Sequence, residues 1–259
     1  MENNFPNKKK HFFCLSGLPR TGSTLLTAIL SQNPKIHSEG YSVLSNIMFD
    51  TYISSTLNKP YLQILQANNR IKTIDDIIST IPFTYYKDIP EEETIIVDNS
   101  RIWTQPYYFQ ILKKYVDSNI KIIVLERPII DIVKSLTKIH KQNDMVLDLV
   151  DLFAPISVTL VQPLNGIKWA KKNNENNNFL FIQYQELVET PQKVIEKIYE
   201  FCGWEAFEHS FENINVKYPI NDEFYGIPGL HTIREKIEFL ENDIELSQEV
   251  LDKIASLES

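Results

Sequence analysis

The sequence predicts a three-layer α/β/α fold with a central parallel sheet, because three observations agree. Four apolar runs have the length and composition of buried strands, at residues 11–16, 94–98, 120–125 and 179–182. Amphipathic helical patterns alternate with these runs. The runs are nearly continuously apolar, which is typical of parallel strands that helices cover on both faces. A chain of 259 residues, 43% of them hydrophobic, suits one such domain over residues 1–259, with helical insertions.

The remaining elements follow from periodicity and from turn residues. Residues 1–10 are polar and form a loose leader before the first strand. Helices are expected at residues 22–32, 105–117, 129–140, 191–202 and 246–257. Two longer regions are mostly helical and are expected to break at prolines: residues 43–90 at Pro60, Pro82 and Pro90, and residues 145–172 at Pro155 and Pro163. The Asn-rich residues 173–178 form a turn, and residues 205–235 are irregular.

The overall charge and the lengths of the apolar runs argue against several classes of partner. The net charge of -8 argues against nucleic acid, because binding a polyanion needs a basic surface. No run approaches the roughly 18 apolar residues of a membrane span, and no secretory signal is convincing. We therefore expect a cytoplasmic protein with neither a nucleic-acid nor a membrane partner. Cys14 and Cys202 are most simply two reduced thiols, although the sequence does not decide whether they pair.

The most informative segment joins the first strand to the first helix, Gly17-Leu18-Pro19-Arg20-Thr21-Gly22-Ser23-Thr24. A Gly-bounded loop between strand and helix is the context of a phosphate-binding loop, whose backbone N–H groups surround an anion. The spacing matches the nucleotide P-loop, so the predicted fold is P-loop-like. Ser23, however, stands where an ATPase or GTPase has Lys, and the cation is Arg20 instead. The loop therefore suits a phosphate but not the usual Mg²⁺-assisted cleavage of a β/γ-phosphate bond.

The loops that follow the four strands are expected to meet, because ligands bind at the carboxyl ends of the strands in such sheets. These loops carry Arg20, Arg101, Arg127 and Tyr184. Arg127 ends a strand, and Ser135 follows eight residues later in the next helix. A guanidinium fork and a hydroxyl donor suit a phosphate. Taken alone, such an Arg is equally explained by a structural ion pair, and such a Ser by a hydroxyl that bonds back to its own helix.

Together these segments resemble the PAPS-dependent sulfotransferase family, where PAPS is 3′-phosphoadenosine 5′-phosphosulfate. The loop pattern is closest to the tyrosylprotein and bacterial-type enzymes. A third segment, Phe181-Ile182-Gln183-Tyr184-Gln185-Glu186-Leu187-Val188, is similar to the family's Tyr-Glu-Asp-Leu segment, with Gln185-Glu186 where Glu-Asp is usual. The resemblance spans roughly residues 11–203. It implies that the first loop holds the 5′-phosphosulfate, that Arg127 and Ser135 hold the 3′-phosphate, and that Tyr184 lies near the nucleotide.

The resemblance also implies the reaction, which is in-line transfer of a sulfuryl group from PAPS to a hydroxyl or amine, leaving PAP. By analogy with phosphoryl transfer, the protein supplies position and positive charge, and no metal is required. Arg20 is the expected source of that charge. Pro19, together with the backbone and hydroxyl donors of Thr21, Gly22, Ser23 and Thr24, completes the expected PAPS-binding site.

Three further assignments follow from the resemblance. Glu39 is the candidate general base, with His37 as its nearby rival and a plain structural carboxylate as the alternative. Arg101 takes the place of a family Lys that helps neutralise the sulfuryl group, or is a surface or acceptor-binding Arg. Arg234 or Lys236 closes over the nucleotide from a late basic segment, or lies on a solvated helix start.

Two other classes of protein fit parts of the pattern. A kinase or NTPase on the same fold needs a P-loop Lys, which is absent, and a Mg²⁺-binding Asp, for which Asp98 is available. A non-catalytic nucleotide-binding protein keeps the fold but turns Arg20 and Glu39 away from the crevice. The acceptor is a small molecule, a sugar or a peptide, and the helical regions 41–92 and 140–172 are expected to face it. The sequence leaves the oligomeric state open.

Overall fold

The computed structural model describes residues 10–234, 236–238 and 242–258, so the predicted leader lies outside the described residues except for Lys10. Five parallel strands form one sheet in the order β2-β3-β1-β4-β5. The strands are β1 (His11–Gly17), β2 (Ile36–Tyr41), β3 (Ile95–Asn99), β4 (Ile122–Glu126) and β5 (Phe179–Gln183). Because β1 lies at the centre, the loop that follows it lies between the loops that follow β3 and β4.

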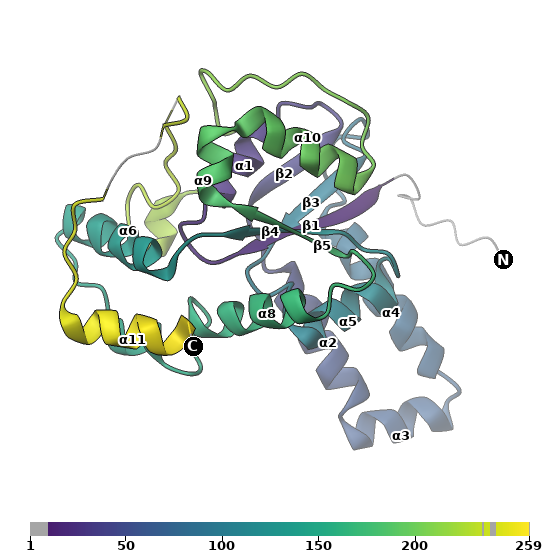
Figure 1. Cartoon of the computed structure of the whole chain (residues 1–259). Coiled ribbons are helices and arrows are strands. Elements are labelled where there is room, and N and C mark those ends of the chain that lie inside the picture. Colours follow the sequence, from purple (N-terminus) through teal and green to yellow (C-terminus); the bar gives the residue numbers. More distant parts are fainter. Residues whose placement is uncertain (1–9, 235, 239–241, 259) are drawn as a thin grey trace.

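Helices cover both faces of the sheet, so the predicted three-layer fold is confirmed (Figure 1). One face packs against α1 (Ser23–Leu30), α9 (Tyr184–Glu189) and α10 (Pro191–Cys202). The other face packs against α2 (Leu44–Thr56), α4 (Ile71–Tyr85), α5 (Pro106–Tyr115), α6 (Ile129–Gln142), α7 (Leu149–Phe153), α8 (Val161–Lys172) and α11 (Gln248–Glu258). Helix α3 (Lys59–Ala67) joins α2 to α4 at the bottom of the view in Figure 1, away from the sheet.

Strand β1 explains why the central runs are apolar in every position. Phe12 and Cys14 point into the apolar core on one face, and Leu15 points into the core on the other. A strand with helices on both faces buries both sets of side chains, which removes the polar alternation of a half-exposed strand. Cys14 and Cys202 are free thiols, and burial raises the pKa of both.

The structure differs from the sequence-based expectation at β2 and at two prolines. Strand β2 was not predicted. Pro163 does not break a helix but is the third residue of α8, where no intrahelical N–H bond is needed. Pro82 lies inside the last turn of α4. In the described part of the chain, no helix is both long and apolar enough to cross a bilayer.

Candidate active site

A cavity of about 330 Å³ opens at the carboxyl ends of the strands. Arg20, Arg101, Arg127 and Tyr184 all line it, each from the loop or helix that follows a different strand. Among the residues that the structure describes, none of these three arginines forms an ion pair with a carboxylate. Glu238, which also lines the cavity, pairs with Arg234 instead, so these three arginines have no carboxylate partner in the described part of the chain.

The loop after β1 presents the start of α1 to this cavity. Gly22 is the N-cap of α1, and Ser23 and Thr24, which begin the helix, line the cavity. No acidic side chain lies in the first turn, and no side chain caps the helix, so its first N–H groups are free to bind an anion. Gly22 has φ 90°, and a Cβ there would lie 2.9 Å from Tyr184 Cδ2, so a side chain at this position conflicts with the loop.

Arg20 connects three parts of the cavity wall. Its Nε donates to Ser135 Oγ on α6 at 3.0 Å, and its Nη1 donates to the carbonyl of Leu230. Its own carbonyl accepts a 2.9 Å hydrogen bond from Arg127 Nη1. Burial, and then the charge of Arg127, lower the pKa of Arg20. The Arg127 guanidinium also lies over the Tyr184 ring, 4.4 Å from its centroid, a distance at which cation and ring attract each other.

Of the other residues predicted to bind PAPS, one does not reach the cavity. Pro19 and Arg234 line the cavity, and Lys236 does so beside Arg234. Arg234 is exposed and pairs with Glu238 at 3.3 Å. Thr21 does not line the cavity, because its side chain is fully buried and its Oγ1 donates to the Leu18 carbonyl at 2.8 Å.

Arg101 lies deep in the cavity wall. Its guanidinium is 5.2 Å from the centroid of the Tyr41 ring, and burial lowers its pKa. No hydrogen bond from this guanidinium joins it to any part of the chain that the structure describes. A buried cation held only against an aromatic face keeps its donors available for a ligand.

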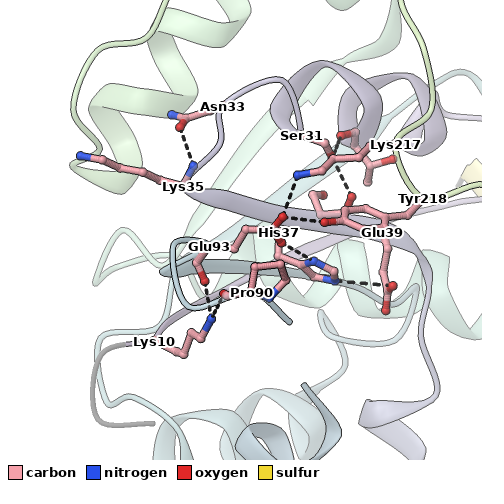
Figure 2. A network of polar contacts seen from close by, with 12 residues as sticks. Lys10, Ser31, Asn33, Lys35, His37, Glu39, Pro90, Glu93, Lys217 and Tyr218 are labelled. Atoms are coloured by element: carbon pink, nitrogen blue, oxygen red, sulfur yellow. Dashed lines mark hydrogen bonds and ion pairs between the residues drawn. The ribbon is translucent and has the colours of Figure 1, made fainter. Parts of the chain in front are cut away.

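Glu39 lies on β2 but does not line the cavity, although the next two residues, Gly40 and Tyr41, do. Its carboxylate instead lies 3.5 Å from His37 Nε2 (Figure 2). His37 Nδ1 in turn lies 2.7 Å from Glu93 Oε2. Glu39 thus belongs to a polar network beside the cavity.

Glu93 is the centre of that network. Its Oε1 accepts hydrogen bonds from Lys217 Nζ at 2.7 Å and from Tyr218 OH at 2.6 Å (Figure 2). Burial alone raises the pKa of Glu93, but the hydrogen bonds from Lys217, Tyr218 and His37 outweigh burial and lower it. The network ties the segment near Lys217 to the edge strand β2.

This arrangement predicts an acid-dependent contribution to stability. The pKa of Glu93 is lower in the folded than in the unfolded chain, so its contribution is complete at neutral pH and is lost as the pH falls through the folded-state pKa. We expect Glu93→Gln to lower the free energy of unfolding by about 2 kcal/mol at pH 7. The difference from the unmodified protein should be smaller at about pH 3.5, below the ordinary glutamate pKa of about 4.3, because protonation of the unfolded chain then offsets part of the advantage of the ionised folded carboxylate.

Urea unfolding at the two pH values measures this difference. The matched control is Glu205→Gln, whose carboxylate pairs with Lys35 on the open surface and is expected to contribute little. A loss of equal size at pH 7 and pH 3.5 would show that Glu93 acts through packing and not through its charge.

Asp98, the carboxylate that a kinase would use for Mg²⁺, lies inside the core. Its Oδ2 accepts from Ser42 Oγ at 2.6 Å and from Tyr86 OH at 2.7 Å, and its Oδ1 accepts from Trp103 Nε1 at 2.6 Å. Burial raises its pKa, against these three hydrogen bonds, which lower it. Asp98 is fully buried and does not line the cavity, so its role here is structural.

The lining residues that sequence reasoning did not assign to the site include Asn99, Lys138 and His231. Lys138 follows Ser135 by three residues and therefore lies on the same face of α6, a spacing that the sequence already contained. Asn99 is the last residue of β3, and the end of each strand borders the cavity. His231 had no recognisable signal, because its position depends on a segment without regular structure.

Comparisons with known proteins agree with this geometry. The sulfotransferase domain family matches residues 10–221. The sulfotransferase domain of the Synechococcus PCC 7002 olefin synthase is 17% identical, with a TM-score of 0.52 over 97% of this chain and 96% of that one. The sulfotransferase domain from the curacin biosynthetic pathway is also 17% identical, with a TM-score of 0.52 over 96% of this chain and 97% of that one. No match was found among curated proteins.

The two structural likenesses support the fold, and the family match identifies the chemistry. The match covers the phosphate-binding loop, Arg101, Arg127, Ser135 and Tyr184. Members of the family use PAPS as co-substrate and act on small-molecule or other acceptors. A kinase is therefore not the favoured alternative. The chain belongs to the sulfotransferase family and is a PAPS-dependent transferase of sulfuryl groups.

Proposed function

We propose that the cavity binds PAPS between the loop after β1 and helix α6, and passes its sulfuryl group to a hydroxyl or amine. The observation that carries the proposal is the set of three cavity arginines, Arg20, Arg101 and Arg127, that lack carboxylate partners in the described chain. Partly desolvated positive charge without a counterion is costly, so the cavity favours an anionic ligand. PAPS brings negative charge at its 3′-phosphate and at its phosphosulfate.

The donor site follows from the elements that meet there. The free N–H groups at Ser23 and Thr24 face the position of the 5′-phosphosulfate. Arg127 and Ser135 offer a cation and a hydroxyl for the 3′-phosphate. Arg234, with its side chain 56% exposed, can move toward a bound nucleotide from the rim.

The reaction requires charge stabilisation and alignment more than covalent catalysis. As the bond between sulfur and the new oxygen forms, the bond to the phosphate oxygen breaks and negative charge builds up on PAP. Arg20 and Arg101, which both line the cavity, are positioned to stabilise that charge. We propose that these cations supply the positive charge, so that no metal is needed.

The acceptor side lies where the region 41–92 borders the cavity. Tyr41 lines the cavity, and Val43, Ile47 and Tyr85 nearby in this region expose apolar surface. These side chains support a partly apolar acceptor, whether a small molecule, a sugar or a peptide. The region 140–172 contributes the exposed Val146 and Val150 to the other proposed acceptor-side segment.

Isothermal titration with PAP, and separately with ATP and Mg²⁺, tests the donor site. We expect PAP to bind without metal, and Arg127→Ala to weaken binding by about 10- to 100-fold, the effect of losing a charged hydrogen bond to phosphate. Arg70→Ala, an exposed arginine beside α4 and outside the cavity, is the matched control. Silence with PAP together with binding of ATP and Mg²⁺ would overturn the proposal and favour a kinase.

A further inference from the structure

A carboxylate and an imidazole are paired at the rim of the cavity, in the segment between α10 and α11 and just beyond the residues that the family match covers. Asp222 begins a short 3₁₀-helix, η1 (Asp222–Tyr225). Its Oδ1 lies 2.5 Å from His231 Nδ1, and its Oδ2 accepts the backbone N–H of His231 at 2.9 Å. The sulfotransferase match ends at residue 221, so neither residue is assigned by it.

This pairing determines which nitrogen of His231 carries the proton. An ionised carboxylate only accepts hydrogen bonds, so Nδ1 must donate to Asp222. The neutral ring then carries a lone pair on Nε2. Within the described residues the hydrogen bond of the ring is the one from Nδ1 to Asp222, and His231 lines the cavity. The ring therefore presents a free proton acceptor to the cavity.

The surrounding contacts hold this ring close to the proposed reaction centre. The residue before it, Leu230, accepts the hydrogen bond from Arg20 that closes this side of the cavity. The Tyr225 ring packs on the His231 ring with 5.2 Å between centroids. The charge of Asp222 opposes the lowering of the Arg20 pKa by burial and Arg127, and Tyr225 has a similar effect on Arg101. Asp222 is thus within electrostatic reach of Arg20.

We propose that His231, held in this tautomer by Asp222, is the general base of the sulfuryl transfer. The inference rests on the proposed function. The acceptor hydroxyl gives its proton to Nε2 while its oxygen bonds to sulfur, and the bond between sulfur and the 5′-phosphate oxygen of PAPS breaks. PAP leaves with that electron pair, and the imidazolium then returns its proton to water. Asp222 is a positioning residue, since it acts through the ring.

Glu39, the base that the sequence predicts, is the competing candidate. Its carboxylate does not line the cavity and faces His37, within the network around Glu93. To accept a proton from an acceptor in the cavity, Glu39 would have to break its contact with His37. His231 needs no rearrangement to present Nε2 to the cavity.

The test measures turnover and donor binding separately. Formation of PAP from PAPS is followed with water, the one acceptor that is always present, and with 4-methylphenol. His231→Ala is expected to lower kcat by about 10²- to 10⁴-fold, the usual contribution of a general base. Added imidazole should restore part of that rate. The affinity for PAP by calorimetry should change by less than about threefold, because the base does not hold the nucleotide.

Three controls separate catalysis from a structural role. Asp222→Asn should lower kcat by about 10-fold or more, because the amide no longer fixes the tautomer. His140→Gln, on α6 and outside the cavity lining, is the matched control for replacing a histidine. Nitrogen-15 NMR of the PAP complex reads the tautomer directly, even without turnover, and should show a proton on Nδ1 of His231 and none on Nε2.

Each contrary result has a distinct meaning. A protonated or hydrogen-bonded Nε2 in the PAP complex, or an unchanged kcat in His231→Ala, overturns the proposal. Equal losses of kcat and PAP affinity without imidazole rescue show that the pair only fastens the loop. If kcat falls in Glu39→Gln but not in His231→Ala, Glu39 is the group that accepts the proton. Absence of PAP binding in the unmodified protein refutes the donor site instead.

Discussion

Replacing Arg20 with alanine is expected to weaken PAP binding by about 100-fold and to lower the rate of sulfuryl transfer by a further 10²- to 10³-fold. The side chain donates to Ser135 on α6 and to the Leu230 carbonyl, so its loss opens two walls of the cavity at once. It also removes the cation nearest the phosphate-binding loop. Calorimetry with PAP and sulfate release from PAPS measure the two effects.

The backbone of Arg20 calls for a second variant, because this residue has φ 63° in the left-handed region. Arg20→Gly relieves that conformation, whereas Arg20→Ala does not. If the guanidinium is what matters, glycine and alanine should be equally damaging, and Arg20→Lys should recover only part of the binding, since an ammonium cannot fork. Recovery of PAP binding by Arg20→Gly would show that the loop conformation, and not the charge, controls the site.

Asp98→Ala is expected to lower the free energy of unfolding by about 3–5 kcal/mol, which is the usual cost of removing one partner from a buried, charged hydrogen-bond network. Three buried donors, Ser42 Oγ, Tyr86 OH and Trp103 Nε1, would lose their common acceptor. Asp98→Asn keeps the shape and one acceptor oxygen, so a smaller loss of about 1–2 kcal/mol is expected. Urea unfolding followed by tryptophan fluorescence measures both variants, and Trp103 reports on the site itself.

The same variants test the kinase alternative. If Asp98 were a Mg²⁺ ligand, Asp98→Asn would leave stability nearly unchanged and would abolish metal-dependent binding of ATP. The structural role predicts the opposite pattern, in which stability falls and PAP still binds to the folded fraction. Calorimetry at a temperature well below the unfolding transition distinguishes the two.

Four of the five strands could be predicted from sequence because each is apolar on both faces. Strand β2 was missed because Ile36 is its only aliphatic residue. It lies at the edge of the sheet and buries His37 and Ser38 at 4% and 2% exposure. Those polar groups are tolerated because Glu93 lies beside His37 and Ser31 donates to the Ser38 carbonyl. A local sequence pattern does not show which distant residues will hydrogen-bond to a strand, so this strand could not be recognised from its own residues.

One feature of the site could be predicted, because the carboxyl ends of the strands in a parallel sheet share one edge. That feature is the convergence of Arg20, Arg101, Arg127 and Tyr184 on one cavity. The direction in which an individual side chain points could not be predicted from the sequence. Thr21 turns inward to the Leu18 carbonyl, although its neighbours in the loop line the cavity. The assignment of Glu39 as base stays a prediction. The pairing of Asp222 with His231 depends on an irregular segment whose course follows from contacts such as that of Asn143 with the Pro228 carbonyl.

The unpaired arginines have a consequence for anyone who handles this protein. A cavity lined by three such arginines is expected to bind small anions as well as the nucleotide, although the chain has a net charge of -8. A buffer with sulfate at 100 times its dissociation constant would stabilise the fold by about 2.7 kcal/mol and would compete with the nucleotide. Purification salts, storage buffers and ammonium sulfate precipitation therefore set the apparent affinity for PAPS. Assays in chloride or acetate should give the higher value.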